Sequence, residues 1–207
     1  MNISNEMMVL EDHNDRHRKR QQNLKSRVDA RISSAKQQRG VFIIFTGNGK
    51  GKTTAAIGTV SRALGHGKKV GIAQYIKKKE NNGEFNFLSQ FNVEFHTMET
   101  DFTWETQNAQ VDTEAARKVW QESKRMLADE SYDLVILDEI TYMLTYHYLD
   151  TQEVMNAIQS RPQQQSVIVT GRGCHRNLLS IADTVSEIRS VKHAFDTGVK
   201  AQEGIDW

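Results

Sequence analysis

The segment FIIFTGNGKGKTTAA, residues 42–56, joins an apolar, strand-like run to a glycine-rich turn and a helix-forming sequence. Gly51, Lys52 and Thr53 match the end of the Walker A phosphate loop, G-x-x-x-x-G-K-[ST]. The first glycine of that pattern would fall where the chain has Thr46. A strand, a loop and a helix in this order are the setting that a phosphate loop requires, so the segment predicts an α/β fold built around a nucleotide site.

The glycines and lysines of this loop suit the binding of phosphate groups. Gly47, Gly49 and Gly51 allow the backbone to turn its N–H groups inward, and the start of the following helix favours anions. Lys52 can neutralise phosphate oxygens, and Thr53 can bind Mg²⁺. A glycine-rich turn with a chance lysine is the alternative, which the flanking strand and helix disfavour. The predicted nucleotide-binding residues of the loop are Thr46, Gly47, Asn48, Gly49, Lys50, Gly51, Lys52, Thr53 and Thr54.

A second, acidic motif is LVILDE at residues 134–139, which has the pattern of a Walker B strand. A carboxylate at the end of a strand beside a phosphate loop can hold Mg²⁺ directly or through water. Asp138, Glu139 and Thr53 are therefore the predicted metal ligands; an ordinary charged strand end is the alternative for the two acids. Arg172 follows another apolar run and is predicted to reach phosphate or substrate, unless it is a surface arginine in a turn.

The rest of the chain alternates between apolar strands and helical segments. Gly65 is predicted to end the helix that follows the loop, and Asp150 with Glu153 to cap a later one. Continuous apolar strands separated by helices indicate a P-loop NTPase-like, RecA-like fold, a mostly parallel sheet with helices on both faces. The predicted strands are residues 41–46, 68–75, 92–98, 132–139, 165–171 and 184–191, and the predicted helices are 51–64, 111–129, 150–161 and 174–183.

The N-terminal residues differ from this pattern. Residues 16–39 are polar, basic and free of Gly and Pro, with a thin apolar stripe at helical spacing: Leu24, Val28, Ile32 and Ala35. One such stripe cannot stabilise a helix alone, so it must pack on this subunit or another. We therefore divide the chain into a basic helical arm, 1–39, and a P-loop domain, 40–207. The arm is a solvated surface helix, a mobile arm that closes over a site, or, least favoured, a nucleic-acid contact.

Composition narrows the classes of protein. The formal net charge is +1, so no nucleic-acid partner is expected. The longest apolar runs are strand-sized, and the start of the chain lacks the basic-then-apolar order of a secretory signal, so no membrane partner is expected either. Cys174 is the single cysteine, which excludes an intrachain disulfide and a four-cysteine zinc site. We expect a cytoplasmic protein.

The motifs taken together resemble a known family, the P-loop type of ATP:cob(I)alamin adenosyltransferase, also called corrinoid adenosyltransferase. They occur in family order over nearly the whole chain, and the Thr46 departure from Walker A is the family's own form of the loop. The stretches that carry the resemblance are FTGNGKGKTTAA, ALGHGKKV, FTWETQN, RMLAD, LDEITYM, TGRGCHR, ADTVSE, VKHAFD and VKAQEGID.

The resemblance implies a reaction and its reactants. In this family a cobalt(I) corrinoid, either cobalamin or a precursor, attacks the 5′ carbon of ATP; the adenosyl group moves to cobalt and triphosphate leaves. The family binds ATP in the reverse direction along its loop, which fits the altered entry at Thr46. The resemblance also implies Mg²⁺ or Mn²⁺, a homodimer, and a flavoprotein that supplies electrons to cobalt. Because cobalt(I) is a strong nucleophile, the protein has to position the reactants and neutralise the leaving triphosphate, for which Lys52 is suited.

Phe102 and Trp104 stand in a polar segment, DFTWETQN at residues 101–108. From the residues alone they either plug the core or line a pocket for a flat, apolar ligand. The resemblance implies that they fill the lower axial face of the corrinoid and exclude its axial ligand, which makes cobalt(II) easier to reduce. With Lys52, they are the predicted catalytic residues.

Two other functions compete with this hypothesis. A generic Mg-ATP-dependent ATPase or kinase would use the same loop, but would release phosphate without any corrinoid. A nucleotide-gated binding module would use the basic arm to contact nucleic acid or a partner, and its polynucleotide binding would fall steeply with salt.

Overall fold

The computed structural model describes residues 3–76, 82–98 and 109–206. The chain forms two compact units, Met1–Gln38 and Arg39–Trp207. Phe102 and Trp104 lie outside the described residues, so their predicted roles are not tested by the structure.

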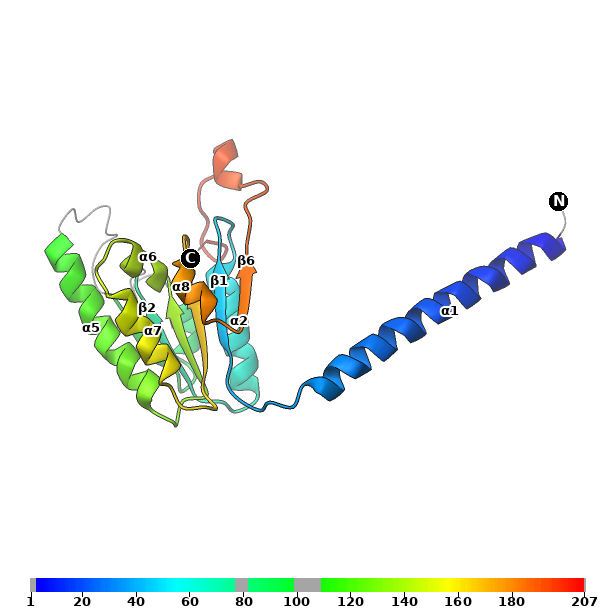
Figure 1. The fold of residues 1–207 in the computed structure, drawn as a ribbon. Coiled ribbons are helices and arrows are strands. Elements are labelled where there is room, and N and C mark those ends of the chain that lie inside the picture. The colour runs from blue at the N-terminus through cyan, green and yellow to red at the C-terminus, as the bar shows by residue number, and fades with distance from the viewer. Residues whose placement is uncertain (1–2, 77–81, 99–108, 207) are drawn as a thin grey trace. The chain divides into compact units, whose positions relative to one another are not determined.

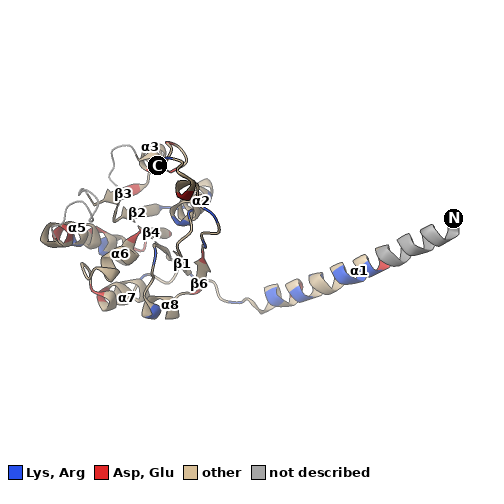
Figure 2. Ribbon diagram, turned by 90° about the horizontal axis from the view of Figure 1, so that it is seen from above, with Lys and Arg blue, Asp and Glu red and all other residues tan. Residues whose placement is uncertain are grey.

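The first unit consists of one long helix, α1 (Ile3–Ser34). The N-terminal segment is helical as predicted, but its helix ends at Ser34 rather than reaching Gly40. The apolar stripe is exposed: the exposed fractions are 56% for Leu24, 45% for Val28 and 67% for Ile32. In Figure 2 the ribbon of the described part of this helix is blue at its basic residues. From the sequence these residues are Arg16, Arg18, Lys19, Arg20, Lys25, Arg27 and Arg31. None of the described helices combines the length and apolar sequence that a membrane crossing needs.

The second unit is built on a six-stranded sheet in which every pairing is parallel. The spatial order is β3-β2-β4-β5-β1-β6, so the strand that precedes the glycine loop lies beside β5 and two positions from β4. All six strands fall within the ranges predicted from the sequence. They are β1 (Phe42–Thr46), β2 (Val70–Gln74), β3 (Glu94–Thr97), β4 (Leu134–Asp138), β5 (Ser166–Thr170) and β6 (Thr184–Glu187).

Helices cover both faces of this sheet, as the apolar strands predicted (Figure 1). One face packs against α2 and α3 through Val60 and Leu88, and the other against four helices through residues such as Trp120 and Ile158. The helices are α2 (Lys52–Gly65), α3 (Gly83–Leu88), α5 (Ala109–Ala128), α6 (Ile140–Thr145), α7 (Thr151–Gln159) and α8 (Arg176–Ser180), followed by the 3₁₀ turn η1 (Ala194–Thr197). Of these elements, α3, α6 and η1 were not predicted from the sequence.

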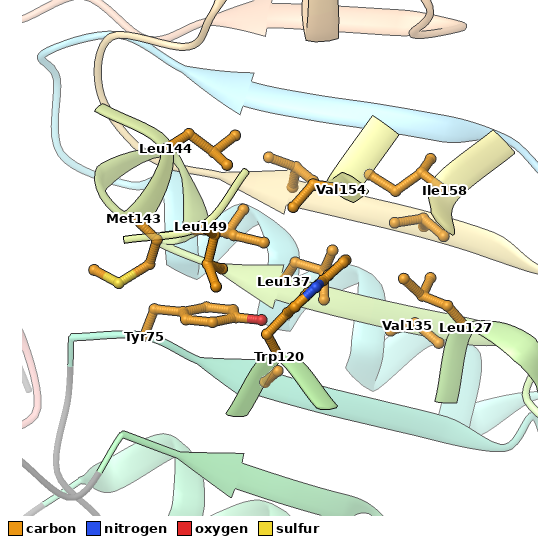
Figure 3. Close-up of a cluster of buried hydrophobic side chains, with 14 of the residues drawn as sticks. Tyr75, Trp120, Leu127, Val135, Leu137, Met143, Leu144, Leu149, Val154 and Ile158 are labelled. Atoms are coloured by element: carbon orange, nitrogen blue, oxygen red, sulfur yellow. The ribbon is translucent and has the colours of Figure 1, made fainter. Parts of the chain in front are cut away.

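The larger part of the core lies between the sheet and α5, α6 and α7, and Figure 3 shows its side chains. Trp120 is 1% exposed, and its indole N–H donates to the Glu153 carboxylate over 2.9 Å. The Tyr75 hydroxyl is hydrogen-bonded to Ser123 over 2.7 Å. Both large aromatic side chains are therefore buried with their polar atoms satisfied, which avoids the cost of leaving a buried polar group unpaired.

Two helix ends show which local predictions were right. Asp150 caps α7 as predicted, because its carboxylate accepts the Glu153 backbone N–H over 2.7 Å. Gly65 is the last residue of α2, as predicted, but it is itself helical, and the glycine with a positive φ lies two residues later, at Gly67. Gly67 has a φ of 68°, its N–H and that of Lys68 donate to the last carbonyl groups of the helix, and this is the geometry of a Schellman end.

Candidate functional site

A cavity of about 660 Å³ lies where the loop after β1 meets the carboxyl ends of β4 and β5. Ligands of open parallel sheets bind at this edge. Charged groups and apolar side chains share its walls, as a nucleotide with a polar phosphate chain and a flat base requires. The lining residues are Gly49, Lys50, Gly51, Lys52, Thr53, Thr54, Ile57, Gly83, Glu84, Phe87, Glu139, Arg172, His193, Gly204, Ile205 and Asp206.

The three loop glycines are required for different reasons. Gly51 precedes α2 with a φ of 116°, a conformation that side chains disfavour, although a Cβ there would meet nothing within 4 Å. Gly47 also has a positive φ, and its Cβ would stand 2.4 Å from the Ile188 carbonyl oxygen. A Cβ on Gly49 would come within 2.8 Å of the Arg189 backbone. The chain after β6 therefore presses against the loop, and the Gly49 N–H donates to Ile188 over 2.7 Å.

Lys52 is held inside the loop at the first residue of α2. It is 6% exposed, and its ammonium group donates to the Gly49 carbonyl oxygen over 2.9 Å. Burial lowers the pKa of Lys52, while the charge of Glu139 acts in the opposite direction and that of Arg172 adds to the lowering. The charges of Glu139 and Arg172, which line the same cavity, therefore both act on this ammonium group.

The two acids at the end of β4 have different surroundings. Asp138 is 1% exposed and accepts hydrogen bonds on both oxygens, from the Gln74 amide over 3.0 Å and from the Thr170 hydroxyl over 2.6 Å. Glu139 lines the cavity. Its backbone has a φ of 60°, and its N–H donates to the Thr170 hydroxyl oxygen over 2.9 Å. Asp138 thus holds Thr170, which in turn orients the backbone of Glu139.

This buried network continues to the other wall of the cavity. The Asn82 side chain donates to the Gln74 side-chain oxygen over 2.7 Å and caps α3 by accepting the Phe85 N–H over 3.1 Å. Because α3 contributes Phe87 to the cavity, one chain of hydrogen bonds links both sides of the site.

Arg172 is exposed on the turn after β5 and lines the cavity. Its carbonyl oxygen accepts the Thr141 hydroxyl over 2.8 Å, which ties the turn to α6. Gly171 makes this approach possible, since it has a φ of 140° and a Cβ would lie 1.9 Å from the Thr141 hydroxyl oxygen.

Most of the predicted nucleotide-binding residues line the cavity, but some do not. Gly49 to Thr54, Glu139 and Arg172 line one cavity. The cavity lining does not include Thr46, Gly47, Asn48 or Asp138. Thr46 is the last residue of β1, and its carbonyl oxygen accepts the Ile188 N–H over 2.8 Å, while Asn48 is exposed.

Two segments of the cavity wall were not predicted from the sequence. One is α3, whose capping residue Asn82 is a recognisable signal two residues ahead of the lining residue Glu84. The other is the C-terminal stretch with His193 and Gly204 to Asp206. VKHAFD and VKAQEGID were part of the family resemblance, but no local pattern in them indicates a position beside the phosphate loop.

The parallel sheet, the glycine loop ahead of α2 and the acidic end of β4 define a P-loop nucleotide-binding protein. The model of the ATP:corrinoid adenosyltransferase BtuR/CobO/CobP family matches residues 38–207. The chain belongs to this family and is a transferase of the corrinoid adenosyltransferase type, with ATP and a corrinoid as its substrates.

Relatives agree with this assignment over most of their length. The corrinoid adenosyltransferase of Escherichia coli K12 is 61% identical over 193 residues, which cover 93% of this chain and 98% of the relative. The corrinoid adenosyltransferase CobA of Salmonella typhimurium is 60% identical over the same shares. Among solved structures, the RadB recombinase aligns with 75% of this chain and 77% of its own, at a TM-score of 0.47 and 18% identity. The assignment rests on the sequence relatives.

Proposed function

We propose that the chain transfers the 5′-deoxyadenosyl group of ATP to the cobalt(I) of a corrinoid, cobalamin or a precursor, and releases triphosphate. The cobalt electron pair forms the Co–C bond while the C5′–O bond breaks, and triphosphate leaves with the electron pair of the broken bond. The observation that carries the proposal is the cavity, where Lys50, Lys52 and Arg172 line one pocket together with the backbone of the phosphate loop. The chain that forms this cavity belongs to the corrinoid adenosyltransferase family.

Lys52 is the proposed electrostatic stabiliser of the leaving triphosphate. Its ammonium group is buried at the base of the loop and bonded to a carbonyl oxygen, so it needs little reorganisation to meet a phosphate oxygen. Thr53, Thr54 and the N–H groups at the start of α2 are the proposed partners of the other oxygens. Thr46, Gly47 and Asn48 are proposed to support the loop rather than to contact the phosphates.

The residues present fit a divalent cation, Mg²⁺ or Mn²⁺. Thr53 and Glu139 both line the cavity and offer the oxygen ligands that these cations prefer. Asp138 has both oxygens occupied by protein hydrogen bonds, so its proposed role is to position Glu139 through Thr170. When bound, the cation would neutralise part of the triphosphate charge.

An anaerobic assay tests the proposal directly. Purified protein, ATP, Mg²⁺ and chemically reduced cobalamin should give the spectrum of adenosylcobalamin and one triphosphate per product. Lys52→Ala should lower turnover about 10²–10³-fold, because the departing charge loses its fixed cation. Phosphate release without corrinoid would favour an ATPase or kinase, and wild-type turnover in Lys52→Ala would remove the lysine from the mechanism.

Phe102 and Trp104 are proposed to exclude the lower axial ligand of cobalt(II). The support for this role is the family resemblance of FTWETQN, which contains both residues. Phe102→Ala and Trp104→Ala should each bind ATP and adenosylate cobalt(I), yet fail when cobalt(II) and a weak reductant are supplied. Electron paramagnetic resonance of cobalt(II) with ATP should then detect less four-coordinate species. An undiminished four-coordinate signal in both variants would return the two rings to the core.

The N-terminal arm is proposed to order over the corrinoid site, motivated by the exposed stripe on α1. Removal of the arm tests this role. Arg39 pairs with Asp183 within the second unit, so the truncated chain should begin at Arg39 and keep that ion pair. This chain should fold and bind ATP but bind corrinoid less well. Unchanged corrinoid affinity would make the arm a surface or dimer helix.

A homodimer, a flavoprotein electron donor and a cytoplasmic location stay predictions. Sedimentation of the full chain tests the first. Turnover from cobalt(II) with a reduced flavoprotein, compared with the same assay without it, tests the second.

A further inference from the structure

The C-terminal end of the described chain returns to the phosphate loop. Gly204, Ile205 and Asp206 line the same cavity as Gly49 to Thr54. The Asp206 carboxylate pairs with the Lys50 ammonium group over 2.5 Å. A residue far along the chain therefore contacts a cation of the loop that holds the phosphates.

Asp206 is held in a defined turn. Its second carboxylate oxygen accepts the Gln202 backbone N–H over 2.8 Å, and its own N–H donates to the Gln202 carbonyl oxygen over 2.8 Å. The hydrogen bond from Lys50, followed by that from Gln202, lowers the pKa of Asp206. The carboxylate is thus presented to the loop in its charged form.

The two loop lysines differ in their freedom to change partners. Lys52 is buried and bonded within the loop. The Lys50 side chain is 44% exposed and its partner Asp206 25% exposed. Ion pairs between such exposed groups are weak and readily exchanged, whereas a triphosphate carries several negative charges.

We propose that Asp206 competes with triphosphate for Lys50, and that this competition limits the affinity of the site for its anionic product. Lys50 turns from Asp206 to the polyphosphate when the cavity fills, and Asp206 recovers it as triphosphate leaves. The functional consequence rests on the proposed release of triphosphate, but the exchange of Lys50 itself does not.

Binding of inorganic tripolyphosphate to the full chain, measured by calorimetry with Mg²⁺ and without corrinoid, tests the exchange. Asp206→Asn removes the charge and keeps an oxygen that can accept the Gln202 N–H. We expect it to bind tripolyphosphate about three- to fivefold more tightly than wild type, the range that breaking an exposed ion pair supplies. Glu203→Gln removes the same charge from an exposed position in the same turn and should change the affinity less than twofold.

Unchanged or weaker binding by Asp206→Asn would overturn the proposal, since Asp206 would then only anchor the turn or support the anion. An equal gain in tripolyphosphate affinity in Asp206→Asn and Glu203→Gln would also overturn it, because the gain would then come from the loss of any nearby negative charge. Inhibition of adenosylation by added tripolyphosphate is the second readout, and it should strengthen by the same factor in Asp206→Asn. Tighter binding by Asp206→Asn would support the exchange whichever product the reaction releases, because the anaerobic assay described above tests the release of triphosphate separately.

Discussion

Replacing each acid at the end of β4 by its amide should separate a cavity residue from a positioning residue. Glu139 lines the cavity, whereas Asp138 is buried and bonded to Gln74 and Thr170. The two variants, Glu139→Gln and Asp138→Asn, remove one negative charge each from neighbouring positions. They should nevertheless fail in different ways.

The expected losses follow from these contacts. In Asp138→Asn one side-chain atom becomes a donor that faces another donor, either the Gln74 amide or the Thr170 hydroxyl. Loss of a charged acceptor in a buried site should lower the free energy of unfolding by about 2 kcal/mol, which corresponds to a fall in Tm of about 4–8 °C for a chain of this size. Turnover should fall about 10-fold, because the orientation of Glu139 relaxes.

Glu139→Gln should show the opposite balance. Its free energy of unfolding should change by less than about 0.5 kcal/mol, since the side chain lines the cavity and is not among the core residues. Turnover with Mg²⁺ should fall about 10²-fold, and Mn²⁺ binding in the presence of ATP should weaken. Glu84→Gln, the same change at another acid of the cavity wall, is the matched control and should affect turnover far less.

Thermal melts, steady-state turnover and the electron paramagnetic resonance signal of free Mn²⁺ measure these quantities. An Asp138→Asn variant that is as stable as wild type yet as inactive as Glu139→Gln would refute the two roles, because Asp138 would then bind the cation itself. Full activity of Glu139→Gln would refute them as well.

Gly49→Ala should weaken ATP binding at least about 10-fold in an equilibrium titration, since its Cβ would stand 2.8 Å from the Arg189 backbone. The control is Gly58→Ala in α2, where a Cβ meets nothing within 4 Å. This variant should bind ATP normally, and its free energy of unfolding should rise by about 0.5–1 kcal/mol. The Arg39 guanidinium holds the pKa of Asp183 at about 2, below its ordinary 3.8, so this stabilisation is complete above that ordinary value and is lost as the pH falls through about 2. Between about pH 5 and pH 2, the free energy of unfolding measured by denaturant titration should therefore fall by about 1 kcal/mol more in wild type than in Asp183→Asn. Equal falls in the two proteins would contradict the ion pair. Burial raises the pKa of Cys174 to about 11, so alkylation by iodoacetamide should be slow at neutral pH and rise about tenfold per pH unit; rapid labelling at neutral pH would place the thiol elsewhere.

Local sequence patterns determined much of the fold. The apolar runs at 70–74 and 134–138 became the fully buried strands β2 and β4, because continuous burial on both faces leaves little room for polar residues. The Asp150 cap was predictable for a similar reason, since the hydrogen bond to Glu153 spans only three residues. The helices α3 and α6 could not be predicted, because they are too short to show a periodic pattern and depend on tertiary packing for their stability.

The phosphate loop, the acid pair and Arg172 were also recognisable from sequence, because a parallel sheet places the carboxyl ends of its strands along one edge. The sequence could not separate Asp138 from Glu139, as both follow the same apolar strand. Their difference comes from Gln74 and Thr170, two residues on neighbouring strands that satisfy the Asp138 carboxylate and leave Glu139 to the cavity. The pairing of Lys50 with Asp206 is likewise a tertiary result, because only the path of the chain after β6 brings a residue so distant in sequence against the loop.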